Sequence, residues 1–215
     1  MGDVIADPFR SARLVLSLRQ AGVTDSKTLQ ALETVSRAAF VPAELEDLAF
    51  EDCVLPAPCG EVIVRPVEAG VLLQTLNMGG RVARTLLLGG GPGYLAALLA
   101  ELSEEVFVVS RYQRAVSAVQ DAFAKLGVDA VHLRHGDPAQ GWAERGPFDR
   151  ILIAAAVDEP PDAVRLQLAQ GGRLLAAIAR RDGQSLAVFD PDGRVEAPRV
   201  QTRLSPLVIG KSAAL

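Results

Sequence analysis

The stretch LLLGGGPGYLAALLA, residues 86–100, decides the fold. A run of leucines is followed by closely spaced glycines and then by an apolar segment rich in Ala and Leu, a pattern typical of strand, tight turn and helix. Glycine lets the backbone turn sharply and lets a ligand approach without a Cβ in the way. Gly89, Gly91 and Gly93 therefore indicate a site for a nucleotide-like ligand at the end of a strand.

The spacing of these glycines separates two kinds of ligand. The order is G-x-G-x-G followed by Tyr94, whereas the dinucleotide fingerprint places its third small residue one position later. This spacing favours S-adenosylmethionine over NAD. A tight turn that holds no ligand remains the alternative on the glycines alone.

Downstream of this stretch, short apolar runs alternate with helical patterns. The helical patterns cover 94–102 and 113–125, and the strand-like runs are RTLLLG (84–89), EVFVVS (105–110), AVHLRHG (130–136), RILIAAA (150–156) and RLLAAIA (173–179). Continuous apolar strands need cover on both faces, which a parallel sheet between helices supplies. SLAVFD (185–190), the turn residues DPDG and the β-prone end of the chain predict a closing antiparallel hairpin.

Upstream of this stretch, apolar spacing predicts two helices, over 7–21 and 25–35, and a third over 67–76 that ends before Gly79 and Gly80. Proline and glycine punctuate 41–50 and 55–70, which predicts a long loop, or arm, with a short extended piece at 61–64. The expected fold is α/β: a Rossmann-like three-layer arrangement with a mostly parallel sheet and an N-terminal helical extension. We expect helices and arm over 1–80 to pack on a core over 81–215 as one compact domain.

Composition limits the partners. Hydrophobic residues make up 49% of the 215 residues, the net charge is -4, and no stretch approaches the roughly 18 apolar residues that span a membrane. We expect neither a membrane nor nucleic acid as partner. Cys53 and Cys59 lack further ligands at zinc spacing, so no metal site is expected. The N-terminus has no signal-peptide pattern, and reduced thiols agree with the cytoplasm.

Seven segments, in order along the chain, carry a resemblance to a known family. They are AAFVPAEL (38–45), LAFEDCVLP (48–56), CGEVIVRP (59–66), LLLGGGPGY (86–94), GDPAQGW (136–142), GPFDRILIAAA (146–156) and QLAQGGRLLAAI (167–178). The chain resembles the protein-L-isoaspartate O-methyltransferases, whose members read like VPREFVP, AYED.PLPIG.GQTISQP, VLEIGTGSGY and GDG..GW in the same order. The resemblance runs from about residue 36 to 210.

The resemblance implies a methyltransferase fold and a repair reaction. The methyl group of S-adenosylmethionine passes to the free carboxylate of an L-isoaspartyl residue in a damaged protein or peptide. Because a sulfonium carries its own activation, the protein mainly positions carboxylate and methyl in line. The implied cofactor-binding residues are the three glycines of the turn together with Ser110, Gly136, Asp137 and Gln184, and Asp137 is expected to accept from the adenine amino group.

The chain departs from the family where chemistry is expected. Leu87 replaces the acid that closes the first strand, and Ser110 replaces the acid that holds both ribose hydroxyls. Loss of that charged acceptor is expected to weaken cofactor binding roughly ten- to a hundredfold. At the catalytic position, Val64 replaces the serine proposed to orient the substrate carboxylate. Arg65, next to it, is a candidate to capture that carboxylate.

Two alternatives to a working methyltransferase follow from these departures. One is a diverged family member, with weak or no methyltransferase activity, that serves as a binding or scaffold protein. The other is an NADP-type reductase in which Arg111, just past the second strand of the core, meets a 2′-phosphate. No residue pattern in the chain supplies a hydride-transfer site for this reductase.

Overall fold

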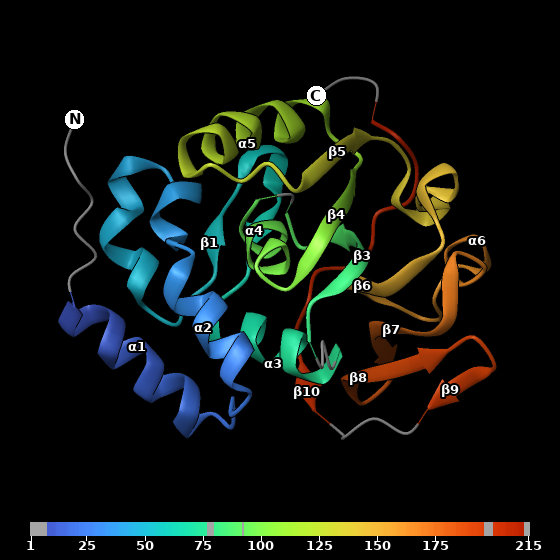
Figure 1. The fold of residues 1–215 in the computed structure, drawn as a ribbon, viewed down its shortest axis with the longest axis horizontal. Helices are drawn as coiled ribbons and strands as arrows, with labels where there is room; N and C mark the ends of the chain where they lie inside the picture. Colours follow the sequence, from blue (N-terminus) through green and yellow to red (C-terminus); the bar gives the residue numbers. More distant parts are fainter. Residues whose placement is uncertain (1–7, 77–79, 92, 196–199, 213–215) are drawn as a thin grey trace.

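The computed structural model describes residues 8–76, 80–91, 93–195 and 200–212 (Figure 1). The N-terminal part contains α1 (Pro8–Gln20), α2 (Ser26–Thr34) and α3 (Pro66–Leu76), the short strands β1 (Leu55–Pro56) and β2 (Val62–Ile63), and 3-10 helices over Arg37–Phe40, Ala43–Phe50 and Pro58–Gly60. The three predicted helices are confirmed. The prediction of a loop over 41–50 was wrong, because Ala43–Phe50 is helical; Gly79 lies outside the described residues.

The core contains the predicted alternation of strands and helices. Its elements are β3 (Val82–Gly89), α4 (Tyr94–Ala100), β4 (Ser103–Ser110), α5 (Gln113–Leu126), β5 (Val131–His135), β6 (Phe148–Val157), α6 (Asp162–Arg165), β7 (Leu168–Arg180), β8 (Gly183–Asp190), β9 (Gly193–Val195) and β10 (Gln201–Thr202). The strand order is β10-β8-β7-β6-β3-β4-β5, with β9 paired to β8. Strands β3 to β7 run parallel, and β8 is antiparallel to its neighbours. The closing antiparallel hairpin is therefore confirmed.

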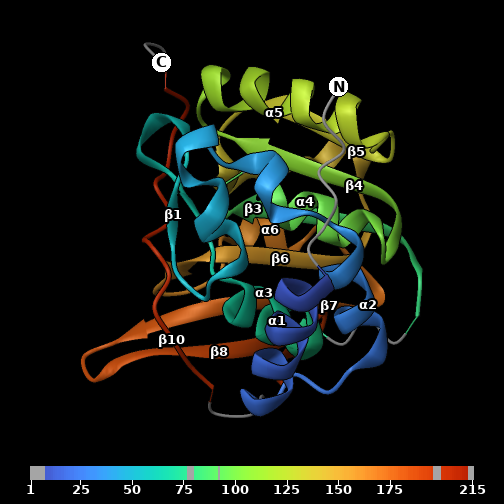
Figure 2. The same cartoon turned by 90° about the vertical axis from the view of Figure 1, so that its left-hand side faces the viewer.

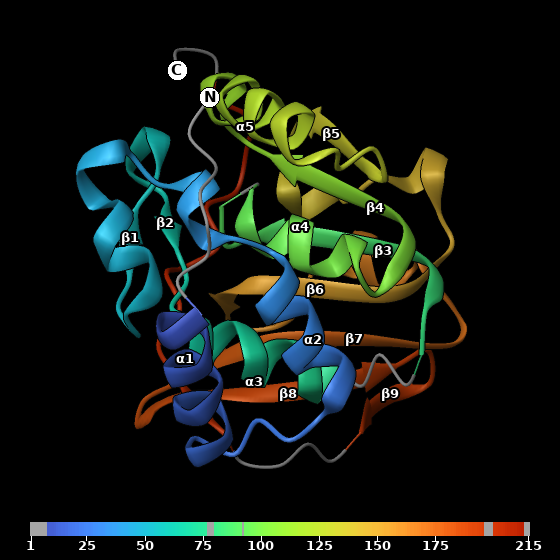
Figure 3. The same cartoon turned by 60° about the vertical axis from the view of Figure 1, so that its left-hand side comes forward.

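The sheet lies between two layers of helices, as a Rossmann-like fold requires. Successive residues of β3 point to opposite faces: Leu87 joins the apolar cluster under α1 to α5, and Leu86 and Leu88 join the cluster that includes Val164 of α6. Figure 3 shows α1 to α5 gathered on one face of the sheet, and Figure 2 shows α6 behind the sheet, where Val164 packs in the other cluster. The larger cluster also draws on Leu18 of α1. The division after residue 80 stays a prediction.

A buried arginine fixes the arm. Arg37 is 4% exposed, and its guanidinium donates to the carbonyls of Cys53 at 2.6 Å and Ile63 at 3.2 Å. It also donates to the carbonyl of Glu51 at 3.3 Å. Burial lowers the pKa of Arg37, although an arginine stays protonated at neutral pH. One side chain thus satisfies carbonyls of a segment with little regular structure and holds it beside the core.

The end of the chain returns across the carboxyl ends of the parallel strands. We call residues 203–212 the C-terminal segment. The Ala156 N–H donates to the Ser205 carbonyl and the Leu207 N–H donates to the Ala156 carbonyl, both at 2.9 Å. Further along, the Ser212 N–H donates to the Arg111 carbonyl at 3.0 Å. Among the described residues, no helix has the length and apolar character needed to cross a membrane.

Candidate functional site

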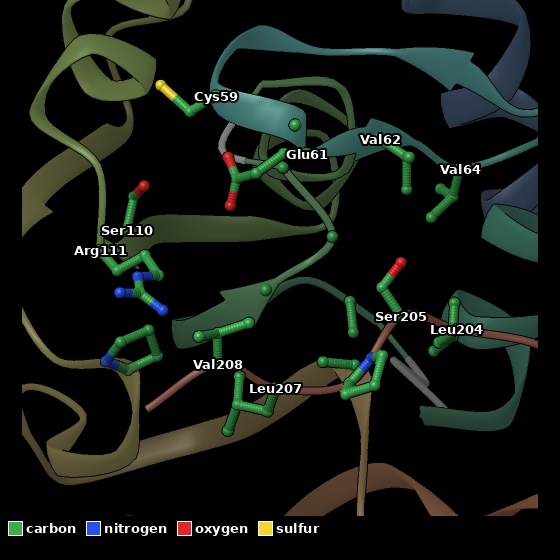
Figure 4. Close-up of a pocket in the computed structure, with 18 of the residues that line it drawn as sticks. Cys59, Glu61, Val62, Val64, Ser110, Arg111, Leu204, Ser205, Leu207 and Val208 are labelled. Carbon is green, nitrogen blue, oxygen red and sulfur yellow. The ribbon is translucent and has the colours of Figure 1, made fainter. Parts of the chain in front are cut away.

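A cavity of about 210 Å³ opens at the carboxyl ends of β3, β4 and β6. The chain builds β3, β4 and β5 in one direction and then returns to place β6 on the other side of β3, so the strand order reverses at β3. Such switch points leave a crevice that binds ligands in open α/β sheets. The cavity is lined by residues 89–91, 108–112 and 154–155 of the core, by 59–62 and Val64 of the arm, and by 203–208 of the C-terminal segment (Figure 4).

The glycine turn forms one wall because its backbone is left-handed. Gly89, Gly90 and Gly91 have φ values of +75°, +73° and +71°, a region that L side chains rarely adopt. A Cβ on Gly90 would lie 2.7 Å from the Ala154 Cβ, and one on Gly91 would lie 3.0 Å from the Val62 carbonyl oxygen. The turn therefore needs glycine both for its conformation and for its close approach to β6 and the arm.

The end of β4 lacks a charged acceptor. The hydroxyl of Ser110, which is 5% exposed, donates to the Tyr112 carbonyl at 3.4 Å and accepts from the Tyr112 N–H at 3.3 Å. Next to it, the Arg111 guanidinium carbon lies 5.0 Å from the centre of the Tyr112 ring. The Arg111 Nε is buried without a hydrogen-bond partner. The Ser110 hydroxyl thus bonds within its own turn. The Arg111 Nε, by contrast, is a hydrogen-bond donor without a partner in a residue that lines the cavity.

Glu61 brings an unsatisfied acceptor to the same cavity from the arm. Its Oε2 is buried without a hydrogen-bond partner. Burial raises the pKa of Glu61 to about 7, and the positive charge of Arg111 offsets part of that rise. Figure 4 shows the Glu61 carboxylate pointing toward the side of the cavity where Ser110 and Arg111 lie. Once Glu61 is ionised, above about pH 7, two groups of opposite charge therefore line the cavity from different segments.

The opposite side of the cavity is apolar except for one hydroxyl. Val64 is 2% exposed and, with Val62 and Leu204, lines this side. The hydroxyl of Ser205 points into the cavity toward Val62 and Val64 (Figure 4). A hydroxyl is therefore directed toward Val64, the position at which the resemblance implies a serine.

Asp137 and Gln184, both predicted to bind the cofactor, make bonds to the C-terminal segment. Asp137 Oδ1 accepts from the N–H groups of Ala139 and Gly210, each at 2.9 Å. Gln184 pairs with the backbone of Leu204: its Nε2 donates to the carbonyl at 3.0 Å, and its Oε1 accepts from the N–H at 2.8 Å. Neither residue lines the cavity, and their contacts with a cofactor stay predictions.

Other predicted residues lie at varying distances from the cavity. Gly136 follows β5, and Gly93 packs so tightly that a Cβ there would lie 2.7 Å from the Phe40 ring. Leu87 is fully buried in the core. Arg65 pairs with Asp52 at 3.5 Å and its side chain is 46% exposed, so its capture of a carboxylate stays a prediction.

Sequence reasoning missed Glu61, Ser205 and Gly90 as cavity residues. Gly90 had a signal, since it interrupts the G-x-G-x-G pattern with a further glycine. Glu61 and Ser205 lie on segments without regular periodicity, where sequence alone does not fix the direction of a side chain. In the described part of the chain, no cluster of His, Cys, Asp and Glu is suited to a metal ion.

The strand order, the left-handed glycine turn and the cavity at the switch point define a Rossmann-like methyltransferase fold. Residues 10–209 match the family model described as protein-L-isoaspartate(D-aspartate) O-methyltransferase. The chain belongs to the protein-L-isoaspartate O-methyltransferase family, whose members are S-adenosylmethionine-dependent protein carboxyl methyltransferases.

Individual relatives agree with this assignment. The protein-L-isoaspartate O-methyltransferase of Maricaulis maris is 37% identical over 98% of this chain and 99% of its own length. That of Azorhizobium caulinodans is 38% identical over 100% of both. A putative family member from Plasmodium falciparum, solved with S-adenosyl-L-homocysteine, shares the fold with a TM-score of 0.76 and 21% identity, covering 91% of this chain and 97% of that one.

Proposed function

We propose that this chain, in the cytoplasm, transfers the methyl group of S-adenosylmethionine to the free carboxylate of L-isoaspartyl residues in damaged proteins. One observation carries the proposal: a single cavity is lined both by the glycine turn and the end of β4 and by the arm and the C-terminal segment. A transfer reaction needs donor and acceptor in one enclosed space, within reach of each other. The exclusion of nucleic acid rests on net charge and stays a prediction.

The described residues fit the cofactor. Glycines 89–91 line the cavity without side chains, and Glu61 Oε2 and Arg111 Nε are buried polar atoms without partners. Buried polar atoms without partners are rare unless a ligand or water satisfies them. When bound, S-adenosylmethionine supplies a methyl group already activated as part of a sulfonium. The residues of the chain then need only bind, orient and exclude water.

Ser205 is the side chain that we assign to the substrate carboxylate. Its hydroxyl points into the cavity and, within the described residues, no protein group accepts a bond from it. It donates to one carboxylate oxygen, while Val62, Val64 and Leu204 keep water away from the other side. An apolar wall that excludes water strengthens the hydrogen bond from Ser205 to the carboxylate. It also strengthens the attraction between the carboxylate and the sulfonium.

The rim of the cavity suits a polypeptide. Val54 and Val208 both line it, and each is 51% exposed. Exposed apolar side chains beside a site commonly mark the place where a partner packs. We expect the residues that flank an isoaspartyl residue in a peptide to pack against them.

The test is methyl transfer from labelled S-adenosylmethionine to a peptide that contains one L-isoaspartyl residue, compared with the same peptide containing ordinary aspartate. We expect label in the first peptide only. If S-adenosylhomocysteine binds but neither peptide is labelled, the binding or scaffold alternative is the better reading. Failure to bind S-adenosylhomocysteine contradicts the proposal itself. Membership of a methyltransferase family contradicts the reductase alternative.

A further inference from the structure

Glu61 and Arg111 leave a gap suited to one kind of chemical group. In the part of the chain that the structure describes, no contact of ion-pair or hydrogen-bond length joins the two side chains, and each keeps a buried atom without a partner. The carboxylate accepts hydrogen bonds, and the guanidinium donates them. A hydroxyl satisfies both, because it donates to Glu61 and accepts from Arg111. A phosphate is repelled by Glu61, and an ammonium is repelled by Arg111.

The backbone holds Glu61 in place before any ligand arrives. The Glu61 N–H donates to the Pro58 carbonyl at 3.3 Å, and its carbonyl accepts from the Ala57 N–H at 2.9 Å. The turn that these bonds close contains Cys59 at φ +64°. Val62, the next residue, pairs with Pro56 in the β1–β2 ladder. The backbone around Glu61 therefore has little conformational entropy left to lose when a ligand binds, which favours binding.

Arg111 is held in a similar way from the other side. Its carbonyl accepts from the Ser212 N–H at 3.0 Å and lies 3.0 Å from His135 Nε2, and its guanidinium stacks on Tyr112. Its position directly after β4 is where the ribose of a nucleoside comes to the sheet in Rossmann-like folds. Ser110, at that same strand end, offers no charge and bonds to its own turn.

We propose that Glu61 and Arg111 together bind the ribose diol of S-adenosylmethionine, and that Glu61 supplies from the arm the carboxylate that Ser110 does not supply from β4. The inference rests on the proposed function, since it presupposes that this cofactor enters the cavity. It makes Glu61 a specificity residue for a ligand with free hydroxyls. In this arrangement the charged acceptor lies on the arm and not at the end of β4. The absence of a carboxylate at Ser110 therefore does not require weak cofactor binding.

Calorimetric titration tests the inference with the full chain, S-adenosylhomocysteine, and its 2′-deoxy and 3′-deoxy analogues. We expect the parent to lose roughly ten- to a hundredfold in affinity when the bonded hydroxyl is absent. In Glu61→Gln the loss should shrink to about threefold or less, because the charge on the acceptor is gone. Glu44→Gln, an exposed carboxylate elsewhere in the N-terminal part, is the matched control and should behave as the parent.

The outcomes separate the inference from the function on which it rests. If the parent binds S-adenosylhomocysteine but loses the same affinity on deoxygenation as Glu61→Gln does, the cofactor site stands and the inference is overturned. If the parent binds none of the three ligands, the proposed function falls and the inference falls with it. Arg111→Met is the second variant, and it should also reduce the preference for the hydroxyl.

A double variant tests whether the two positions are alternatives. Ser110→Glu in the Glu61→Gln background returns a carboxylate to the end of β4, and we expect it to recover roughly tenfold or more of the lost affinity. Ser110→Glu alone should gain less, because two carboxylates then share one small space and repel each other. Equal gains in both backgrounds would show that Glu61 does not act on the diol.

Discussion

At two single residues, Ser110 and Val64, this chain carries neither the acid nor the serine that the family resemblance implies. The structure places a carboxylate, Glu61, and a hydroxyl, Ser205, around the same cavity. The carboxylate comes from the arm and not from the end of β4, and the hydroxyl comes from the C-terminal segment and not from the arm. What matters to a bound ligand is the direction from which a hydrogen bond arrives and the charge behind it, not the position of its source in the chain.

Ser205→Ala tests the hydroxyl that faces the substrate. We expect kcat on an isoaspartyl peptide to fall by roughly tenfold with a smaller change in KM, because the hydroxyl orients the carboxylate for in-line attack on the methyl group. Adding Val64→Ser to this variant returns a hydroxyl from the opposite wall and should recover part of the rate. Steady-state kinetics of the parent, both single variants and the double variant measure the effect. Unchanged turnover in Ser205→Ala would remove Ser205 from the reaction.

How well a residue could be predicted from sequence depended on how its position is fixed. The glycine turn could be predicted because both its left-handed backbone and its close approach to neighbouring segments require glycine. At these positions the residue type therefore indicates the backbone conformation. The direction of Glu61 depends on a turn around Cys59 and on the buried Arg37 that holds the arm. These are contacts between segments far apart in sequence, which a local pattern does not record.

At the scale of elements, strands and helices of the core could be predicted because their apolar runs and periodicities were long. The 3-10 helix Ala43–Phe50 could not, since its short turns produce no sustained period and a neighbouring proline suggested a loop. The path of the C-terminal segment could not be predicted from the sequence either. It is held by two hydrogen bonds to Ala156 of β6, two to Gln184 and one to Asp137, and each of these involves a partner distant in sequence.

Gln184→Ala distinguishes a wall-supporting residue from a cofactor ligand. The side chain makes two bonds to the Leu204 backbone, so its loss should lower the free energy of unfolding by roughly 1–3 kcal/mol. Affinity for S-adenosylhomocysteine should fall as well, because Leu204 and its neighbours line the cavity. Gln201→Ala, an exposed glutamine on the paired strand, should change stability by less than about 0.5 kcal/mol. Lost affinity with unchanged stability would instead make Gln184 a direct ligand.

At the scale of the whole molecule, Glu61 links stability to pH. Burial raises its pKa from the ordinary 4.5 to about 7, so the folded state holds a proton that the unfolded state has already released. The stability that the protonated group contributes is complete below pH 4.5 and is lost as the pH rises through about 7. A shift of this size corresponds to about 3 kcal/mol.

Glu61→Gln should therefore be more stable than the parent above pH 7 and similar to it near pH 4.5, without ligand. Denaturant unfolding of both proteins across this range measures the difference. The comparison cancels other ionisable groups around the cavity, such as Glu68 and Arg203, while the interaction of Glu61 with Arg111 is part of what is measured. A constant difference at all pH values would mean that the Glu61 carboxyl does not titrate as described. Greater stability combined with weaker cofactor binding is the pattern expected of a group kept for function.

The closing wall of the cavity comes from residues 203–208, which are synthesised after every strand of the sheet. A ribosome holds the newest residues in its exit tunnel, so a nascent chain can assemble its strands and glycine turn while this wall is still inside the tunnel. The pocket is completed only after residues 203–208 have left the tunnel. A stop codon shortly before residue 203 would thus yield a product with nearly the whole sheet and no closed site.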